Sequence, residues 1–124
     1  MVIAHAVQYA AFGRAIEGRI DVITHVPLDK TLDKLITDFM LSQRIVAVPT
    51  LSMMEKVYTN LKRPGADYLH SLESITAMHK AGIPILAGTD ANNDQGSPVK
   101  VQHGESLHHE FDCLLRLDYP TWRR

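Results

Sequence analysis

The chain has 124 residues, of which 45% are hydrophobic and 22% are charged. This balance is typical of one ordinary folded domain and excludes a disordered chain. The formal net charge of −1 provides no electrostatic footprint for nucleic acid or for an anionic membrane surface. We therefore expect neither nucleic acid nor membranes among its partners.

The cysteine content and the first residues predict a cytoplasmic protein. Cys113 is the only cysteine, so no internal disulfide can form and nothing indicates an oxidising compartment. The N-terminal residues lack the basic and long apolar regions of a signal peptide. No apolar run approaches the roughly 20 residues that a membrane span needs.

Four short apolar runs, rich in β-branched residues, predict strands. They lie at 2–5, 21–25, 45–51 and 83–90. None shows the alternation of a half-exposed strand, so we expect strands that are buried on both faces, as in a parallel sheet.

Helical patterns alternate with these runs. An Ala-rich stretch over 8–18 is compatible with a helix, and amphipathic patterns cover 28–44, 66–82 and 106–117. Asp67 is a candidate N-cap and Gly82 a candidate C-terminal stop, and Ser106 could cap the last helix. The predicted core residues on these helices are Leu32, Leu35, Ile36, Phe39, Met40, Leu69, Leu72, Ile75, Met78, Leu107, Phe111, Leu114 and Leu115. The alternation predicts an α/β fold with right-handed crossovers and a parallel sheet.

Three of the predicted strands end on a potential metal ligand. His5, His25 and Asp90 occupy these ends, and functional groups gather at the carboxyl ends of parallel strands. Imidazole and carboxylate are the usual ligands of zinc and similar divalent ions. The alternative for each histidine is a plain hydrogen-bonded loop residue, and Asp90 could equally cap a helix or form a turn.

The other histidines are weaker candidates. His103 lies in the loop that follows Asp90, where it is either a substrate contact or a plain loop residue. His70, His79, His108 and His109 lie on helical patterns and are expected at the surface.

The order of these motifs resembles the metal-dependent amidohydrolase superfamily, in particular the branch that contains imidazolonepropionase and prolidase-like enzymes. The similarity is carried by the segments 2–26, 45–51, 82–92 and 103–115. Its most specific parts are His-Ala after the first strand, Thr-His after the second, and Gly-Thr-Asp at 88–90. The resemblance extends to about residue 117, so residues 118–124 are predicted to be a tail outside the family.

The resemblance implies a (β/α)8 barrel that hydrolyses amide or other C–N bonds with one or two divalent ions, zinc or manganese. By the same resemblance His5, His25 and Asp90 are metal ligands. Asp90 would take a proton from the attacking water and pass it to the leaving nitrogen, and His25 would bind a second ion or stabilise the oxyanion. The implied substrate is a small amide or dipeptide, with Asn92 and His103 as candidate contacts.

The sequence also departs from that superfamily. It contains no His-x-His pair, and a full barrel takes about 250 residues. We therefore predict half of a (β/α)8 barrel, equivalent to strands five to eight, as a single partial domain over residues 1–124. Two hypotheses follow: a C–N hydrolase domain that is truncated and inactive alone, or a non-catalytic half-barrel that only assembles with a second copy or a missing half. Exposed sheet edges favour a homo-oligomer.

Overall fold

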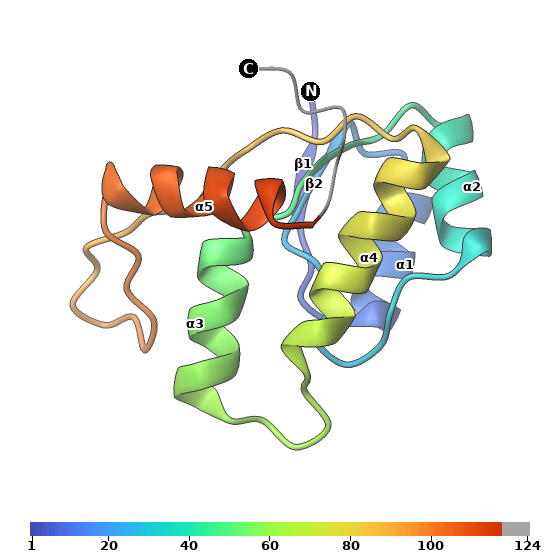
Figure 1. Cartoon of the computed structure of the whole chain (residues 1–124). Coiled ribbons are helices and arrows are strands. Elements are labelled where there is room, and N and C mark those ends of the chain that lie inside the picture. Colours follow the sequence, from blue (N-terminus) through green and yellow to red (C-terminus); the bar gives the residue numbers. More distant parts are fainter. Residues whose placement is uncertain (118–124) are drawn as a thin grey trace.

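In residues 1–117, three short parallel strands form a sheet in the order β1-β2-β3, and the chain also forms five helices (Figure 1). This computed structural model describes residues 1–117, and the predicted tail at 118–124 lies outside the described residues. The strands are β1 Ile3–His5, β2 Val22–Thr24 and β3 Val46–Val48. The helices are α1 Tyr9–Glu17, α2 Lys34–Ser42, α3 Leu51–Leu61, α4 Tyr68–Ala81 and α5 Glu105–Leu115.

The prediction of a regular fourth strand over 83–90 is wrong. This segment lies beside β3 in the parallel direction, but only one bridge joins Ala47 to Ile85. The Ala47 amide donates to Pro84 O, and the Leu86 amide donates to Ala47 O, each at 2.9 Å. The next bond on either side would need an amide hydrogen from Pro84 or from Pro49. Because proline has none, the ladder stops after one bridge.

The sheet is covered on one face only, so the prediction of burial on both faces is also wrong. The parallel register places Ala4, Ile23 and Ala47 side by side, and Ile23 and Ala47 are buried. Their neighbours along the strands point to the opposite face, where Ile3 is 49% exposed. We call this second surface the open face of the sheet.

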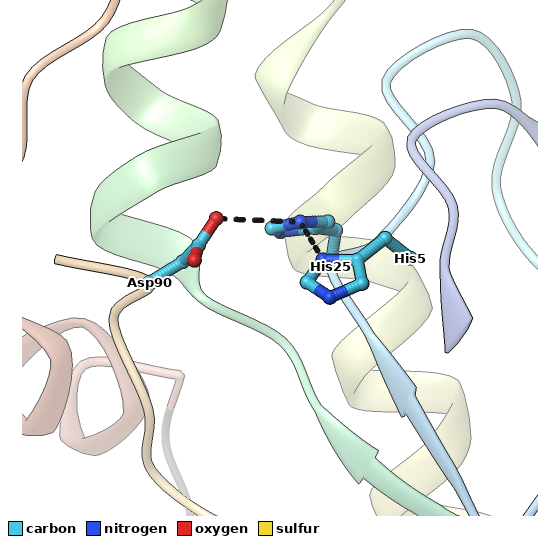
Figure 2. Close-up of side chains that lie close together, drawn as sticks. All are labelled: His5, His25 and Asp90. Atoms are coloured by element: carbon cyan, nitrogen blue, oxygen red, sulfur yellow. Dashed lines mark hydrogen bonds and ion pairs between the residues drawn. The ribbon is translucent and has the colours of Figure 1, made fainter. Parts of the chain in front are cut away.

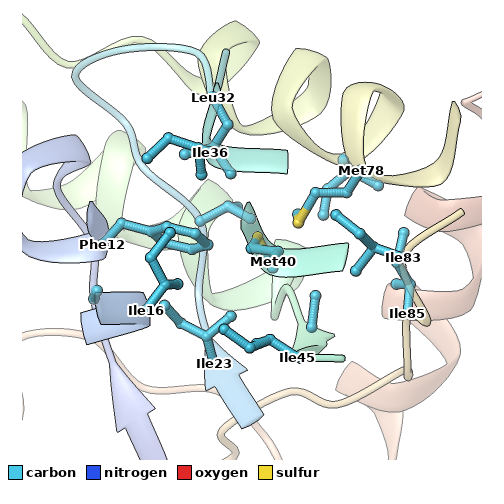
Figure 3. Packing of buried hydrophobic residues seen from close by; sticks show 14 of the residues in the cluster. Phe12, Ile16, Ile23, Leu32, Ile36, Met40, Ile45, Met78, Ile83 and Ile85 are labelled. Atoms are coloured by element: carbon cyan, nitrogen blue, oxygen red, sulfur yellow. The ribbon is translucent and has the colours of Figure 1, made fainter. Parts of the chain in front are cut away.

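The hydrophobic core lies on the covered face, beneath α1, α2 and α4 (Figure 3). Phe12 and Ile16 of α1 pack with Ile36 and Met40 of α2, and Met78 of α4 joins the same cluster. These five side chains are all at least nine-tenths buried, which removes most of their apolar surface from water.

The sequence predicts both caps of α4 correctly, but not the N-cap of α5. The Asp67 side chain accepts a hydrogen bond from the Leu69 amide at 2.9 Å, and Gly82 ends the helix with a φ of 84°, which confirms both predicted caps. Gly104, rather than Ser106, occupies the N-cap position of α5.

Several predicted core positions are exposed instead. They are Leu35 at 77%, Phe39 at 36%, Leu69 at 53%, Leu107 at 41%, Phe111 at 48% and Leu115 at 42%. On α5 the buried residues are Ser106, Glu110 and Leu114, so the helix turns a different face inward from the one its apolar stripe predicts. The physical reason is the burial of Glu110, described next.

Helix α3 was not predicted, because its first residues read as the end of an apolar strand. Its N-terminus meets the carboxylate of Glu110, which is 0% exposed. That carboxylate accepts hydrogen bonds from the Leu51 amide at 2.9 Å, the Ser52 amide at 2.7 Å and Ser52 Oγ at 2.7 Å. Burial raises the pKa of Glu110, whereas the hydrogen bonds from Ser52 and Leu51 act in the opposite direction. The positive end of the helix dipole also stabilises a negative carboxylate at the helix N-terminus.

None of the helices described in residues 1–117 is both long and apolar enough to cross a membrane.

We expect Glu110→Gln to lower the free energy of unfolding by about 2–4 kcal/mol, because an amide has one acceptor oxygen where the carboxylate has two, and its NH2 group would face backbone donors. Urea unfolding followed by circular dichroism measures the change. The control is Asp112→Asn on the exposed side of the same helix, expected within about 0.5 kcal/mol of the original chain. Equal stability of Glu110→Gln and the original chain would contradict this role of Glu110.

Candidate functional site

His5, His25 and Asp90 converge at the carboxyl ends of their strands, where Figure 2 shows their side chains pointing toward one another. His5 is the last residue of β1, His25 directly follows β2, and Asp90 ends the segment beside β3. One side-chain nitrogen or oxygen from each residue lies within 4.8 Å of the other two. The structure thus brings together all three residues that the sequence predicts as metal ligands.

His25 occupies the centre of this group. Its Nε2 lies 3.0 Å from His5 Nδ1 and 3.7 Å from Asp90 Oδ2. The two imidazole rings are tilted by 50° with centroids 5.1 Å apart, so they are not stacked on one another. Two imidazole nitrogens and one carboxylate oxygen therefore face a common point.

The ring of His25 is held from its other side by Thr50. Thr50 Oγ1 lies 2.7 Å from His25 Nδ1, and the His25 amide donates to Val48 O at 2.9 Å. Burial lowers the pKa of His25, His5 adds to this effect, and Asp90 opposes it. A lowered pKa favours the neutral imidazole, which is the form that binds metal ions and accepts protons.

Backbone strain is concentrated at these strand ends. His25, Thr50 and Asp90 have φ values of 71°, 51° and 51°, in the left-handed region that is costly for residues other than glycine. Among the described residues 1–117, the remaining non-glycine residues of this kind are Arg19, Arg44 and Lys62, which follow helices, where this conformation is ordinary. A backbone that keeps three strained residues at one edge is typical of functional sites.

Gly88 allows the segment that carries Asp90 to lie close to β3. A Cβ atom at this position would stand 2.5 Å from Val48 Cγ1, which is closer than side chains tolerate. Close packing against β3 therefore favours glycine at this position of the Gly-Thr-Asp motif.

A cavity of about 260 Å³ adjoins His25 and Asp90. Its walls are largely apolar, with side chains of α3 on one side and residues 97–99 on the other, and its polar lining includes Arg63 and Asn92. Asn92 Oδ1 is buried and has no hydrogen-bond partner among residues 1–117.

The remaining predicted site residue, His103, lies elsewhere. It is exposed in the turn before α5 and does not line this cavity, as far as the described residues define it. Its proposed contact with substrate stays a prediction.

Two residues at the site were missed by sequence reasoning. Thr50 lies two residues after the end of β3, so the rule that functional groups gather at strand ends would have found it. Arg63 follows α3, which was itself unpredicted, and no local pattern marks it.

No family model matches the sequence, and no curated protein matches it significantly. Solved structures do match its fold. A Xaa-Pro dipeptidase crystallised with methionine in its active site superposes with a TM-score of 0.71 and 23% identity, over 96% of this chain and 29% of that chain. Ochratoxinase from A. niger gives a TM-score of 0.57 and 24% identity, over 73% and 22% of the two chains. A prolidase in complex with N-methylphosphonate-L-proline gives 0.56 and 22%, over 72% and 24%.

These matches show that the chain shares its α/β fold with part of a Xaa-Pro dipeptidase, an ochratoxinase and a prolidase. The chain spans less than a third of the length of each of these three structures.

Proposed function

We propose that the chain is part of a metal-dependent amidohydrolase-type enzyme, with residues 1–124 as one partial domain corresponding to strands five to eight of a (β/α)8 barrel. The activity we propose for the complete enzyme is hydrolysis of a C–N bond in a small amide or dipeptide-like substrate. The observation that carries the proposal is the convergence of His5, His25 and Asp90 within 4.8 Å at one edge of a parallel sheet.

The architecture supports a half-barrel in two ways. The strand order β1-β2-β3 is sequential, and the segment after α4 lies next to β3, as consecutive β/α units of a barrel do. The open face of the sheet lies opposite the helices, where a barrel would have its interior.

The donor set fits a divalent metal ion. Two imidazoles and one carboxylate, from three different segments, match the ligand types of catalytic zinc and also suit manganese. When bound, such an ion lowers the pKa of its water and polarises the scissile carbonyl. His5, His25 and Asp90 would hold it.

The side chains around this point have distinct roles in the proposed reaction. Thr50 fixes the orientation of the His25 ring through Nδ1. The carboxylate of Asp90, 48% exposed, is accessible to take a proton from the attacking water and deliver it to the leaving nitrogen. The cavity beside them would receive the substrate.

The lining of the cavity suits a dipeptide-like substrate. Its apolar walls can cover a side chain or a proline ring, and the guanidinium of Arg63 is a suitable partner for a free carboxylate. Asn92 also lines the cavity and is our candidate for a polar contact with the substrate. The ligand of the prolidase structure, N-methylphosphonate-L-proline, is a proline derivative and so combines such a ring with a carboxylate.

An assembly role is the second candidate function. Val2, Ile3 and Leu86 are between 49% and 56% exposed on or beside the open face and its edges. Apolar residues on an uncovered sheet favour association with a second copy or with the other half of a barrel.

We expect the isolated chain to bind manganese weakly through this site, with binding lost in His5→Ala and in His25→Ala. The reason is that each substitution removes one of only three ligands. Electron paramagnetic resonance of free Mn²⁺ during a titration measures the bound fraction, and manganese disfavours thiolate ligands. His108→Ala, at an exposed histidine of α5, is the matched control and should bind as the original chain does. Unchanged binding in both site variants would refute the proposed ligand set.

We expect no measurable hydrolysis of prolyl dipeptides or cyclic amides by the metal-loaded chain alone. His5 is exposed and Asp90 is half exposed, so water screens the interactions that a closed site would strengthen. Release of amino acids, followed by chromatography, measures turnover. Turnover that disappears in Asp90→Asn would show that the chain is an active enzyme by itself, and the inactivity part of the proposal would be wrong.

We expect the chain to associate at high concentration through the open face, and Ile3→Glu to shift it toward the monomer. A charge placed there cannot be buried without cost. Sedimentation velocity over a range of concentrations measures the change. Leu35→Glu is the matched control, since Leu35 is 77% exposed on α2, away from the sheet, and should leave association unchanged. A monomer at every concentration would count against the assembly role.

A further inference from the structure

A second group of potential metal ligands lies between α3 and α5, and it shares no residue with the first. Glu55 comes from α3, while His109 and Cys113 lie one turn apart on α5, so both face the same side of that helix. Figure 1 shows α5 crossing close to α3. One ligand atom from each of the three residues lies within 4.8 Å of the others.

The distances within this group are close to those of a tetrahedral site. His109 Nε2 lies 2.6 Å from Glu55 Oε2 and 3.6 Å from Cys113 Sγ. Zinc bonds of about 2.0–2.3 Å place neighbouring donors of a tetrahedron roughly 3.3–3.7 Å apart. The sulfur and the imidazole therefore already have the required separation, and the carboxylate has to move away from the imidazole by about 1 Å.

The side chains can make this adjustment without a change in the backbone. Those of His109 and Glu55 are 46% and 45% exposed, so the glutamate carboxylate has solvent on one side into which it can rotate. The same exposure leaves a fourth position open to water. Cys113 is half-buried, so its sulfur has less room to move than the other two ligands.

We propose that Glu55, His109 and Cys113 form a second divalent metal site, selective for zinc-like ions, that clasps α3 to α5. One thiolate, one imidazole and one carboxylate make a donor set that suits zinc or cobalt better than magnesium, calcium or manganese. A plain ion pair between His109 and Glu55 would need no sulfur beside it, whereas a metal site uses all three groups. The site is independent of the proposed hydrolase activity.

The test is a titration of the reduced chain with Co²⁺ alone, followed by ultraviolet and visible absorption. A cobalt ion bound to a thiolate gives a charge-transfer band that imidazole and carboxylate ligands do not. Because Cys113 is the only cysteine in the chain, such a band reports this site and no other. We expect the band to appear, to be lost in Cys113→Ser, and to be lost or strongly weakened in His109→Ala.

Three further variants separate this site from alternatives. Glu55→Gln should raise the cobalt dissociation constant by about tenfold or more, because even changes beyond the direct ligands cost about 10–100-fold. His108→Ala and His25→Ala should leave the band unchanged, the first as a matched surface control and the second because His25 belongs to the other site. Far-ultraviolet circular dichroism confirms that each variant is folded.

The proposal is overturned if the folded, reduced chain gives no charge-transfer band, or if the band persists in both His109→Ala and Glu55→Gln. A band that disappears in His25→Ala would equally contradict two separate sites. Because the proposed hydrolase site is tested with manganese and contains no sulfur, failure of one proposal leaves the other measurable.

Discussion

The arrangement of both candidate sites depends on the contact between the buried carboxylate of Glu110 and the N-terminus of α3. The carboxylate closes the N-terminus of α3 through two backbone amides and one hydroxyl, and so fixes the position of α3 against α5. Removing a carboxylate from water is costly, and three donors together with the helix dipole offset that cost. The residue directly before the capped amides is Thr50, so the same contact sets where Thr50 meets His25.

Helix α3 therefore connects the two candidate metal sites. Thr50 holds the ring of His25 at one end of the helix, and Glu55, five residues further along, faces His109 of α5. A shift of α3 along α5 would change both groups at once. Because Glu110 and His109 are consecutive on α5, the cap and the second group of ligands are also fixed relative to each other.

The sequence predicts those features that depend on local chemistry, and misses those that depend on distant partners. The caps at Asp67 and Gly82 are local, since an Asx side chain and a left-handed glycine act within one turn. The convergence of His5, His25 and Asp90 follows from the parallel alternation alone. The buried face of α5 could not be predicted, because Glu110 is satisfied by amides 58 and 59 residues away. The short hydrogen-bond ladder between β3 and the segment 83–90 has a local cause, the prolines Pro49 and Pro84. Sequence reasoning overlooked them because both lie within apolar runs that are otherwise typical of strands.

The proposed assembly and the proposed metal binding would be coupled through the open face of the sheet. His5 is exposed at the carboxyl end of β1, an outer strand of the sheet. Asp90 is half-exposed at the carboxyl end of the segment beside β3, so solvent reaches both side chains. Any partner that covers the open face would exclude this water and strengthen the attraction between the carboxylate and a bound cation. A cation held there would in turn order the strand ends that the partner contacts. By linkage each event would favour the other to the same extent. Under the proposed function, the same residues would serve as a weak site in the isolated chain and as a stronger one in an assembly.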